Sequence, residues 1–108
     1  MNDINQIILE GTCSTDASIK TTARGWKYGS VTIEHKVTYP VADGKTETEV
    51  RYFDIEARNT LADFMFKKCK KGVHIRVVGR LTYDCYRNDF GKLCSKSKVL
   101  AEHFEVRA

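Results

Sequence analysis

Apolar and polar residues alternate along residues 31–39, and this pattern restricts the possible folds more than any other feature of the chain. The odd positions include Val31, Ile33, Val37 and Tyr39, while the even positions are Thr32, Glu34, Lys36 and Thr38. A period of two predicts a β-strand with one face toward a core and the other toward solvent. Because the pattern recurs elsewhere in the chain, we expect a protein built mainly of β-sheet.

Four further strands are expected on the same grounds. The first covers residues 5–11 and continues after a bend through residues 18–20, and the others cover residues 50–57, 73–81 and 98–106. Tyr52 is expected to face away from the core, and Gly79 to permit a sharp coil in its strand. Residues 21–29 are expected to form a loop, residues 40–47 an extended turn, and residues 82–99 a hairpin that turns at residues 88–91.

A single helix is expected over residues 60–70. Asn59 stands where a capping side chain would be, Leu61, Phe64 and Met65 recur at helical spacing, and Gly72 supplies a stop. The order strand, strand, strand, helix, strand, strand is that of the OB-fold, a five-stranded Greek-key barrel. The sequence therefore predicts an all-β fold with one short helix.

Size, charge and cysteine spacing exclude several classes of protein. A chain of 108 residues suits one domain, residues 1–108, and has no apolar run long enough to span a membrane. The first residues, MNDINQ, resemble neither a secretion signal nor a transit peptide, so we expect a cytoplasmic, nucleoid-associated protein with free thiols. Four cysteines without CxxC spacing and three scattered histidines predict no metal site and no cofactor.

Aromatic residues lie beside cationic residues in several of the expected strands, although the net charge is only +4. Single-stranded nucleic acid offers flat base faces and charged phosphates, so rings and cations at nucleotide spacing bind it whatever its sequence. The candidate binding residues are the rings of Tyr39, Tyr52, Tyr83, Tyr86 and Trp26 and the cations of Lys36, Arg51, Arg80, Arg87 and Lys92. Any one of these tyrosines is equally compatible with a packing role, so the prediction depends on the set.

Nearly the whole chain resembles the bacterial single-stranded DNA-binding protein family. The resemblance lies in NQIILEG with Asp16, GSVTIEHKVTY, RYFDIEARNTLADF, KKGVHIRVVGRLTYDCYRNDFGK and SKVLAEHFEV. It implies an OB-fold, usually a homotetramer, that coats single-stranded DNA in replication, recombination and repair. It also implies that Tyr39, Tyr52 and Tyr86 stack on bases, with Arg58 at a fourth position that is aromatic in many relatives.

The resemblance leaves two alternatives open. The chain ends at Arg107-Ala108, without the acidic, aromatic tail through which bacterial members recruit replication and repair enzymes. Either a tail is missing from this sequence, or the chain is similar to tailless relatives such as the dimeric primosomal replication protein.

A protein-interaction barrel that binds no nucleic acid is the rival from another class, because fold does not fix function. Catalytic motifs such as GxSxG or a Walker loop do not occur in the sequence, so no enzyme activity is expected.

Overall fold

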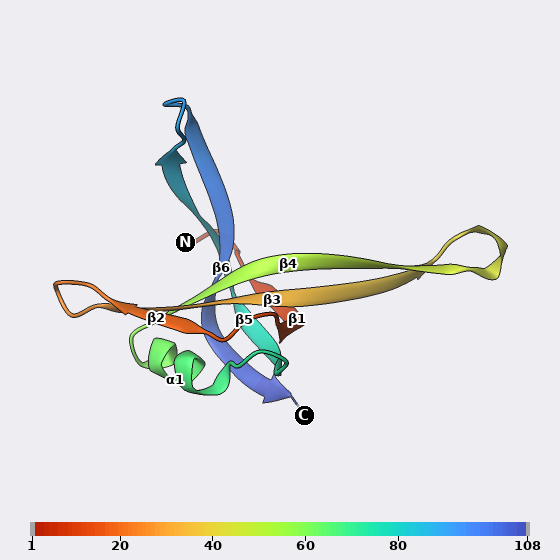
Figure 1. Cartoon of the computed structure of the whole chain (residues 1–108), viewed down its shortest axis with the longest axis horizontal. Coiled ribbons are helices and arrows are strands. Elements are labelled where there is room, and N and C mark those ends of the chain that lie inside the picture. The colour runs from red at the N-terminus through yellow and green to blue at the C-terminus, as the bar shows by residue number, and fades with distance from the viewer. Residues whose placement is uncertain (1, 108) are drawn as a thin grey trace.

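Five strands of the protein close into a ring, and a sixth short strand extends the sheet at one place. The computed structural model describes residues 2–107. Its elements are β1 (Ile7–Cys13), β2 (Ser18–Thr21), β3 (Lys27–Pro40), β4 (Thr46–Arg58), α1 (Thr60–Lys68), β5 (His74–Arg87) and β6 (Leu93–Arg107), with a 3-10 turn at Ala42–Gly44 (Figure 1).

Strand pairing closes the barrel in the order β1, β5, β6, β4, β3 and back to β1. The neighbours are antiparallel except β4 and β6, which run parallel and pair at Ile55 with Val99 and at Glu56 with Leu100. The end of β1 pairs with β3 at residues 33–34 and the short β2 pairs with β3 at residues 27–30, so β1 and β2 lie in succession along β3 as two parts of one bent strand. The predicted five-stranded OB-fold barrel with one helix is confirmed.

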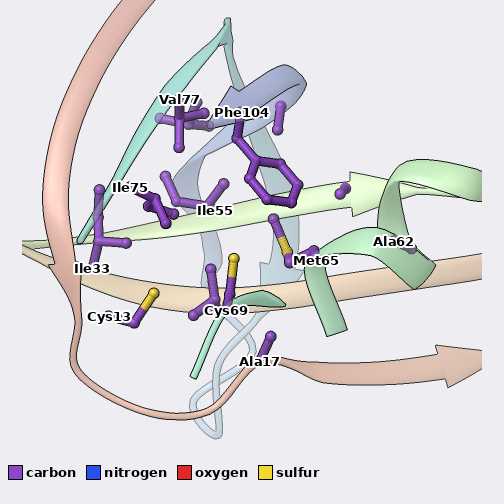
Figure 2. Packing of buried hydrophobic residues seen from close by; sticks show 14 residues of the cluster. Cys13, Ala17, Ile33, Ile55, Ala62, Met65, Cys69, Ile75, Val77 and Phe104 are labelled. Carbon is purple, nitrogen blue, oxygen red and sulfur yellow. The ribbon is translucent and has the colours of Figure 1, made fainter. Parts of the chain in front are cut away.

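The core of the barrel comes from the alternation seen in the sequence. Ile33, Ile55, Ile75 and Val77 have no exposed surface, and Met65 of α1 packs among them (Figure 2). Strand neighbours of these residues, such as Thr32 and Asp54, point the other way and stay partly exposed. The predicted faces of the strands at residues 31–33 and 53–57 are therefore confirmed.

Two long hairpins extend beyond the barrel; the sequence predicted the second, with its turn at residues 88–91, but underestimated the length of the first. β3 and β4 continue as a two-stranded arm whose tip is Val41–Lys45, so Pro40 and Thr46 belong to strands and not to the expected turn (Figure 1). β5 and β6 form a second arm that reaches Arg87 and Leu93. Both faces of an arm meet solvent, so its side chains need no alternation, while cross-strand pairing still satisfies its backbone groups.

Four smaller expectations were wrong. Lys27 and Tyr28 are part of β3, because they pair with Thr21 and Lys20 of β2, and not of a loop. The helix ends at Lys68, two residues early, where Cys69 takes an extended conformation. Asn59 makes no side-chain capping bond; its φ of +55° turns the chain, and its carbonyl accepts from the backbone N–H groups of Ala62 and Asp63. Leu81 was expected inside with Val77 and Gly79 but is 51% exposed, because it lies where β5 leaves the barrel.

Gly79 allows the coil that the sequence predicted in β5. The register between β5 and β6 shifts between Val78 and Gly79. A Cβ atom at Gly79 would lie 2.1 Å from the carbonyl oxygen of Leu100, which is far inside van der Waals contact. Only glycine lets the two backbones approach so closely at this bulge.

Among residues 2–107, no helix has the length and apolar character needed to cross a membrane.

Candidate nucleic-acid interface

The pairing register of the strands places one set of side chains on the outside of the barrel. We call this set the outer face; it consists of the even-numbered residues 28–36 of β3, 50–58 of β4, 80–86 of β5 and 94–98 of β6. On β3 and β4, Tyr52 pairs with Glu34 and Arg58 pairs with Tyr28. On the β5–β6 arm, Tyr86 pairs with Cys94 and Asp84 with Lys96.

The rings of the outer face are accessible. Tyr52 is 62% exposed and Tyr86 is 50% exposed, so either ring has a free surface for a flat ligand. Tyr28 is half-buried, with the guanidinium of Arg58 5.8 Å from the centre of its ring. A cation held near an aromatic ring is itself a planar surface on which a base can stack.

A cavity of about 370 Å³ opens on the outer face between the β5–β6 arm and the β2–β3 hairpin. Tyr28 forms part of its wall. Its charged lining consists of three lysines and three carboxylates, namely Lys20, Lys96, Lys98, Asp54, Glu56 and Asp84. Formal charges of opposite sign therefore balance within the cavity.

Ion pairs connect the charged groups of this cavity. The Lys98 ammonium lies 2.8 Å from both Glu56 and Asp84, and the Lys96 ammonium lies 3.0 Å from Asp54. Asp54 also accepts a hydrogen bond from the Thr32 hydroxyl at 2.9 Å. β6 lies between β4 and β5 in the sheet, so its lysines reach carboxylates on both neighbours.

The ion pairs shift the pKa values of their members in the expected directions. The hydrogen bond from Lys96 lowers the pKa of Asp54 against the opposing effect of its partial burial, and the same bond raises the pKa of Lys96. Burial alone would lower the pKa of Lys98, but the bonds to Asp84 and Glu56 outweigh it, so this pKa is raised. All three groups therefore stay charged at neutral pH.

Two further pockets flank the cavity. One of about 240 Å³ is bordered by Tyr52, Leu81 and Lys96. The other, of about 300 Å³, lies at the β2–β3 hairpin and is bordered by Trp26, Tyr28 and Arg58. Trp26 is 53% exposed at the end of this hairpin. The outer face thus has a succession of hollows, each with at least one aromatic side chain and one cation.

The structure brings together about half of the binding residues that were predicted from the sequence. Tyr52, Tyr86, Arg58, Lys36 and Arg80 lie on the outer face, and Trp26 borders the pocket at its end. By register, Tyr39 and Arg51 lie on the opposite face of the β3–β4 arm. Tyr83 and Arg87 lie on the opposite face of the β5–β6 arm, and Lys92 follows the turn at that arm's tip.

Tyr39 differs from the other candidate rings in its surroundings as well. Its hydroxyl donates to Glu49 at 3.1 Å and to Glu47 at 3.3 Å. The hydrogen bond to Glu49 raises the pKa of Tyr39 above its ordinary value. Two carboxylates beside a ring repel a phosphate backbone, so this ring is less suited to stacking than Tyr52 or Tyr86.

Three of the six candidate cations already have carboxylate partners. Lys36 lies 3.4 Å from Glu34, Arg51 lies 2.8 Å from Glu49, and Arg58 lies 3.4 Å from Glu56. Arg80 and Lys92 make no ion pair within residues 2–107, and Arg87 donates to the carbonyl of Gly91 at 3.0 Å. A polyanion that binds here meets some free cations and must compete for others.

Sequence reasoning missed Tyr28, Lys96 and Lys98 as site residues. Tyr28 was placed in a loop, although its two-residue spacing from Ser30 and Thr32 continues the alternation of β3. The lysines were noticed only as charge, because their carboxylate partners are Asp54 and Glu56, about forty residues earlier in the chain. No cluster of three or more potential metal ligands occurs in the described part of the chain.

Two solved structures of single-stranded DNA-binding proteins share this architecture. The Plasmodium falciparum SSB, solved in complex with ssDNA, superposes with a TM-score of 0.87 at 16% identity and covers 100% of this chain and 98% of its own. The single-stranded DNA-binding protein of Thermus aquaticus superposes with a TM-score of 0.83 at 23% identity over 97% of this chain and 50% of its own. At these identities the likeness establishes the OB-fold alone.

The family follows from the sequence match. The model of the Single-strand binding protein family matches residues 4–107, so this chain belongs to that family. The single-stranded DNA-binding protein of Wolinella succinogenes is 26% identical over 102 residues, which are 94% of this chain and 63% of that protein. The protein of the same name from Aquifex aeolicus is 25% identical over 103 residues, 95% of this chain and 69% of that protein. The chain thus spans about two thirds of the length of these relatives.

Proposed function

We propose that the protein binds single-stranded DNA without sequence preference along its outer face. The observation that carries this proposal is the exposure of Tyr52 and Tyr86 on one continuous face with Tyr28 and Arg58. Membership of the Single-strand binding protein family supports it, as does the bound ssDNA named for the Plasmodium falciparum relative.

In this proposal, base stacking is assigned to the outer-face rings and phosphate contact to the cations around them. Tyr28, Tyr52 and Tyr86 stack on bases, each with a contribution of about 1–3 kcal/mol. Trp26 extends the track at the β2–β3 hairpin. Phosphate contacts are assigned to Lys36, Arg58, Arg80 and Lys92. Tyr39, Tyr83, Arg51 and Arg87, on the opposite faces of the arms, contribute only where the DNA strand wraps around an arm.

The cellular role follows from such binding. A protein of this kind coats and protects exposed single strands during replication, recombination and repair, and it works in the cytoplasm in association with the nucleoid. The role requires no catalytic step, so labelled DNA incubated with the protein and magnesium is expected to remain uncut. Replication and repair proteins are its proposed partners beyond DNA.

We also propose that the protein is a homo-oligomer, a tetramer or alternatively a dimer as in primosomal relatives. In the described residues, Thr12 and Cys13 of β1 pair with β3, whereas residues 7–11 pair with β5 on one side only. An open strand edge is a template for pairing with another chain. Ile8 on the same strand is 68% exposed, which adds apolar surface for a second copy to cover.

A fluorescence titration tests the DNA-binding proposal. Adding oligo-dT at low salt is expected to quench the emission of Trp26 and the exposed tyrosines, because stacked bases quench aromatic fluorescence. The logarithm of the affinity is expected to fall with the logarithm of salt concentration, with a slope of about −0.7 per phosphate neutralised. Absence of quenching, confirmed by absence of a mobility shift, would favour a protein-interaction barrel instead.

A further inference from the structure

We propose that Asp54, Glu56 and Asp84 restrain single-stranded DNA binding by holding Lys96 and Lys98 in ion pairs that DNA phosphates must displace. This inference rests on the proposed function, since it concerns the strength of binding at the same face. It assigns a regulating role to carboxylates that a polyanion would be expected to avoid.

A DNA strand that follows the outer-face rings must pass close to these carboxylates. Asp54 lies two residues from Tyr52 on β4, and Asp84 lies two residues from Tyr86 on β5, so each carboxylate shares a face with its neighbouring ring. A base stacked on either ring brings its phosphate close to a carboxylate. The DNA path therefore crosses the charged cavity.

A phosphate gains little from Lys96 or Lys98 unless an ion pair opens, whereas Lys20 in the same cavity makes no ion pair within residues 2–107. Lys96 and Lys98 both have carboxylate partners at 2.8–3.0 Å. A phosphate can take a lysine only by replacing a carboxylate, and it then gains only the difference between two similar interactions. Cations without such partners, by contrast, offer their full attraction.

Unequal exposure indicates which pair opens. Lys98 and Glu56 are each 16% exposed, whereas Asp84 is 65% exposed. Asp84 can therefore rotate into solvent while Lys98 remains seated beside Glu56, which leaves one side of the ammonium for a phosphate. Asp54 is less free, because it is 34% exposed and bound to Thr32 as well as to Lys96. Asp84 is thus the principal restraint.

Replacement of a carboxylate by a phosphate at a lysine is expected to reduce the salt dependence of the DNA affinity. When a phosphate is neutralised, the DNA releases a condensed cation, and this release makes binding weaken as salt rises. A carboxylate displaced from its lysine attracts a cation in turn, so the net release is smaller. Without the carboxylate, the lysine binds phosphate with no such compensation.

The decisive variant is Asp84→Asn, which keeps the side-chain shape and removes one charge. At low salt its affinity for oligo-dT is expected to rise by about two- to fivefold, the size of one partly exposed ion pair. Its log–log salt slope is expected to become steeper by up to about 0.7, the contribution of one phosphate on single strands. Both quantities come from fluorescence titrations across a salt series.

Glu102→Gln is the matched control, because it removes one negative charge from an exposed position on β6 that has no ion pair within the described residues. A general charge effect would change both variants equally, and that result would overturn the inference. A second test is Asp84→Asn in a Lys98→Met background, where the gain is expected to vanish. Should Lys98→Met not fold, Asp54→Asn, acting through Lys96, tests the same exchange.

The outcomes separate the two proposals. If the wild-type protein binds no oligo-dT, the proposed function fails. If the wild type binds but Asp84→Asn binds equally or more weakly, with an unchanged salt slope, the function stands and the restraint is refuted. Stronger binding and a steeper slope in Asp84→Asn, but not in Glu102→Gln, support the restraint.

Discussion

The value of an individual side chain in this protein depends on the face to which register assigns it. Tyr39 and Tyr52 both occur in strands and both stand beside charged residues, and the sequence ranks them equally. In the structure, Tyr52 joins Tyr86 on the outer face, while Tyr39 turns the other way and donates hydrogen bonds to two glutamates. Tyr39 and Tyr52 therefore have different surroundings, although they are the same residue type.

This difference predicts unequal effects of alanine substitution. Tyr86→Ala is expected to weaken oligo-dT binding by about 1–3 kcal/mol, because a stacking surface is lost. Tyr39→Ala is expected to change affinity by less than the lower end of that range, since its ring lies beside carboxylates on the opposite face. Equilibrium titration measures both values, and thermal melting checks that both variants fold. Equal losses of affinity would contradict the assignment of faces, and unfolding of Tyr86→Ala would mean that its ring supports the fold.

At the scale of elements, the barrel depends on places where backbones approach closely. The bulge at Val78 and Gly79 lets β5 coil from the barrel into the arm that carries Tyr86. At Gly29 of β3, a Cβ atom would meet the backbone and side chain of Ala62 in α1 at 3.1–3.2 Å. Glycine in these strands thus positions both the arm and the helix.

The two close approaches predict a graded loss of stability. Gly79→Ala is expected to reduce the free energy of unfolding by about 1–3 kcal/mol or more, the range that is typical of overpacking. The reason is that its Cβ atom would lie 2.1 Å from a backbone oxygen. Gly29→Ala is expected to have a smaller effect, since α1 can shift by a few tenths of an ångström. Urea denaturation compares the two variants. A larger loss at Gly29 than at Gly79 would show that the bulge tolerates a side chain.

At the scale of the whole molecule, the barrel is small and much of the chain lies outside it. Two arms and a hairpin project from the barrel (Figure 1). Isolated two-stranded hairpins are marginally stable in water, so arms of this length are expected to gain order from a ligand or a second copy. Exposed apolar side chains such as Ile8 and Tyr83 are consistent with assembly.

Assembly through β1 predicts that a charge at Ile8 separates the subunits. Ile8→Glu is expected to shift the mass measured by light scattering toward that of a single chain, because a carboxylate cannot be buried against an apolar partner surface without a large penalty. Ile8→Val keeps an apolar side chain and is expected to assemble as the wild type does. An unchanged mass for Ile8→Glu would place any interface elsewhere.

Local side-chain pattern was enough to predict the order of strands and helix, the core residues Ile33, Ile55 and Val77, and the outward orientation of Tyr52. The sequence by itself determined these because burial depends on the two-residue period of a strand, which neighbouring residues record. The pairing of rings with cations predicted nucleic-acid binding, and resemblance to a family added the role in replication, recombination and repair and the position of Arg58.

Only the tertiary structure decided how far the β3–β4 arm extends and which charges meet. The arms depend on cross-strand hydrogen bonds between backbone groups, which leave no mark on side-chain periodicity. Lys98 meets Glu56 and Asp84 because β6 lies between β4 and β5, so a parallel contact joins segments that are distant in the chain. Ion pairing depends on distance in space, and the closed barrel sets that distance.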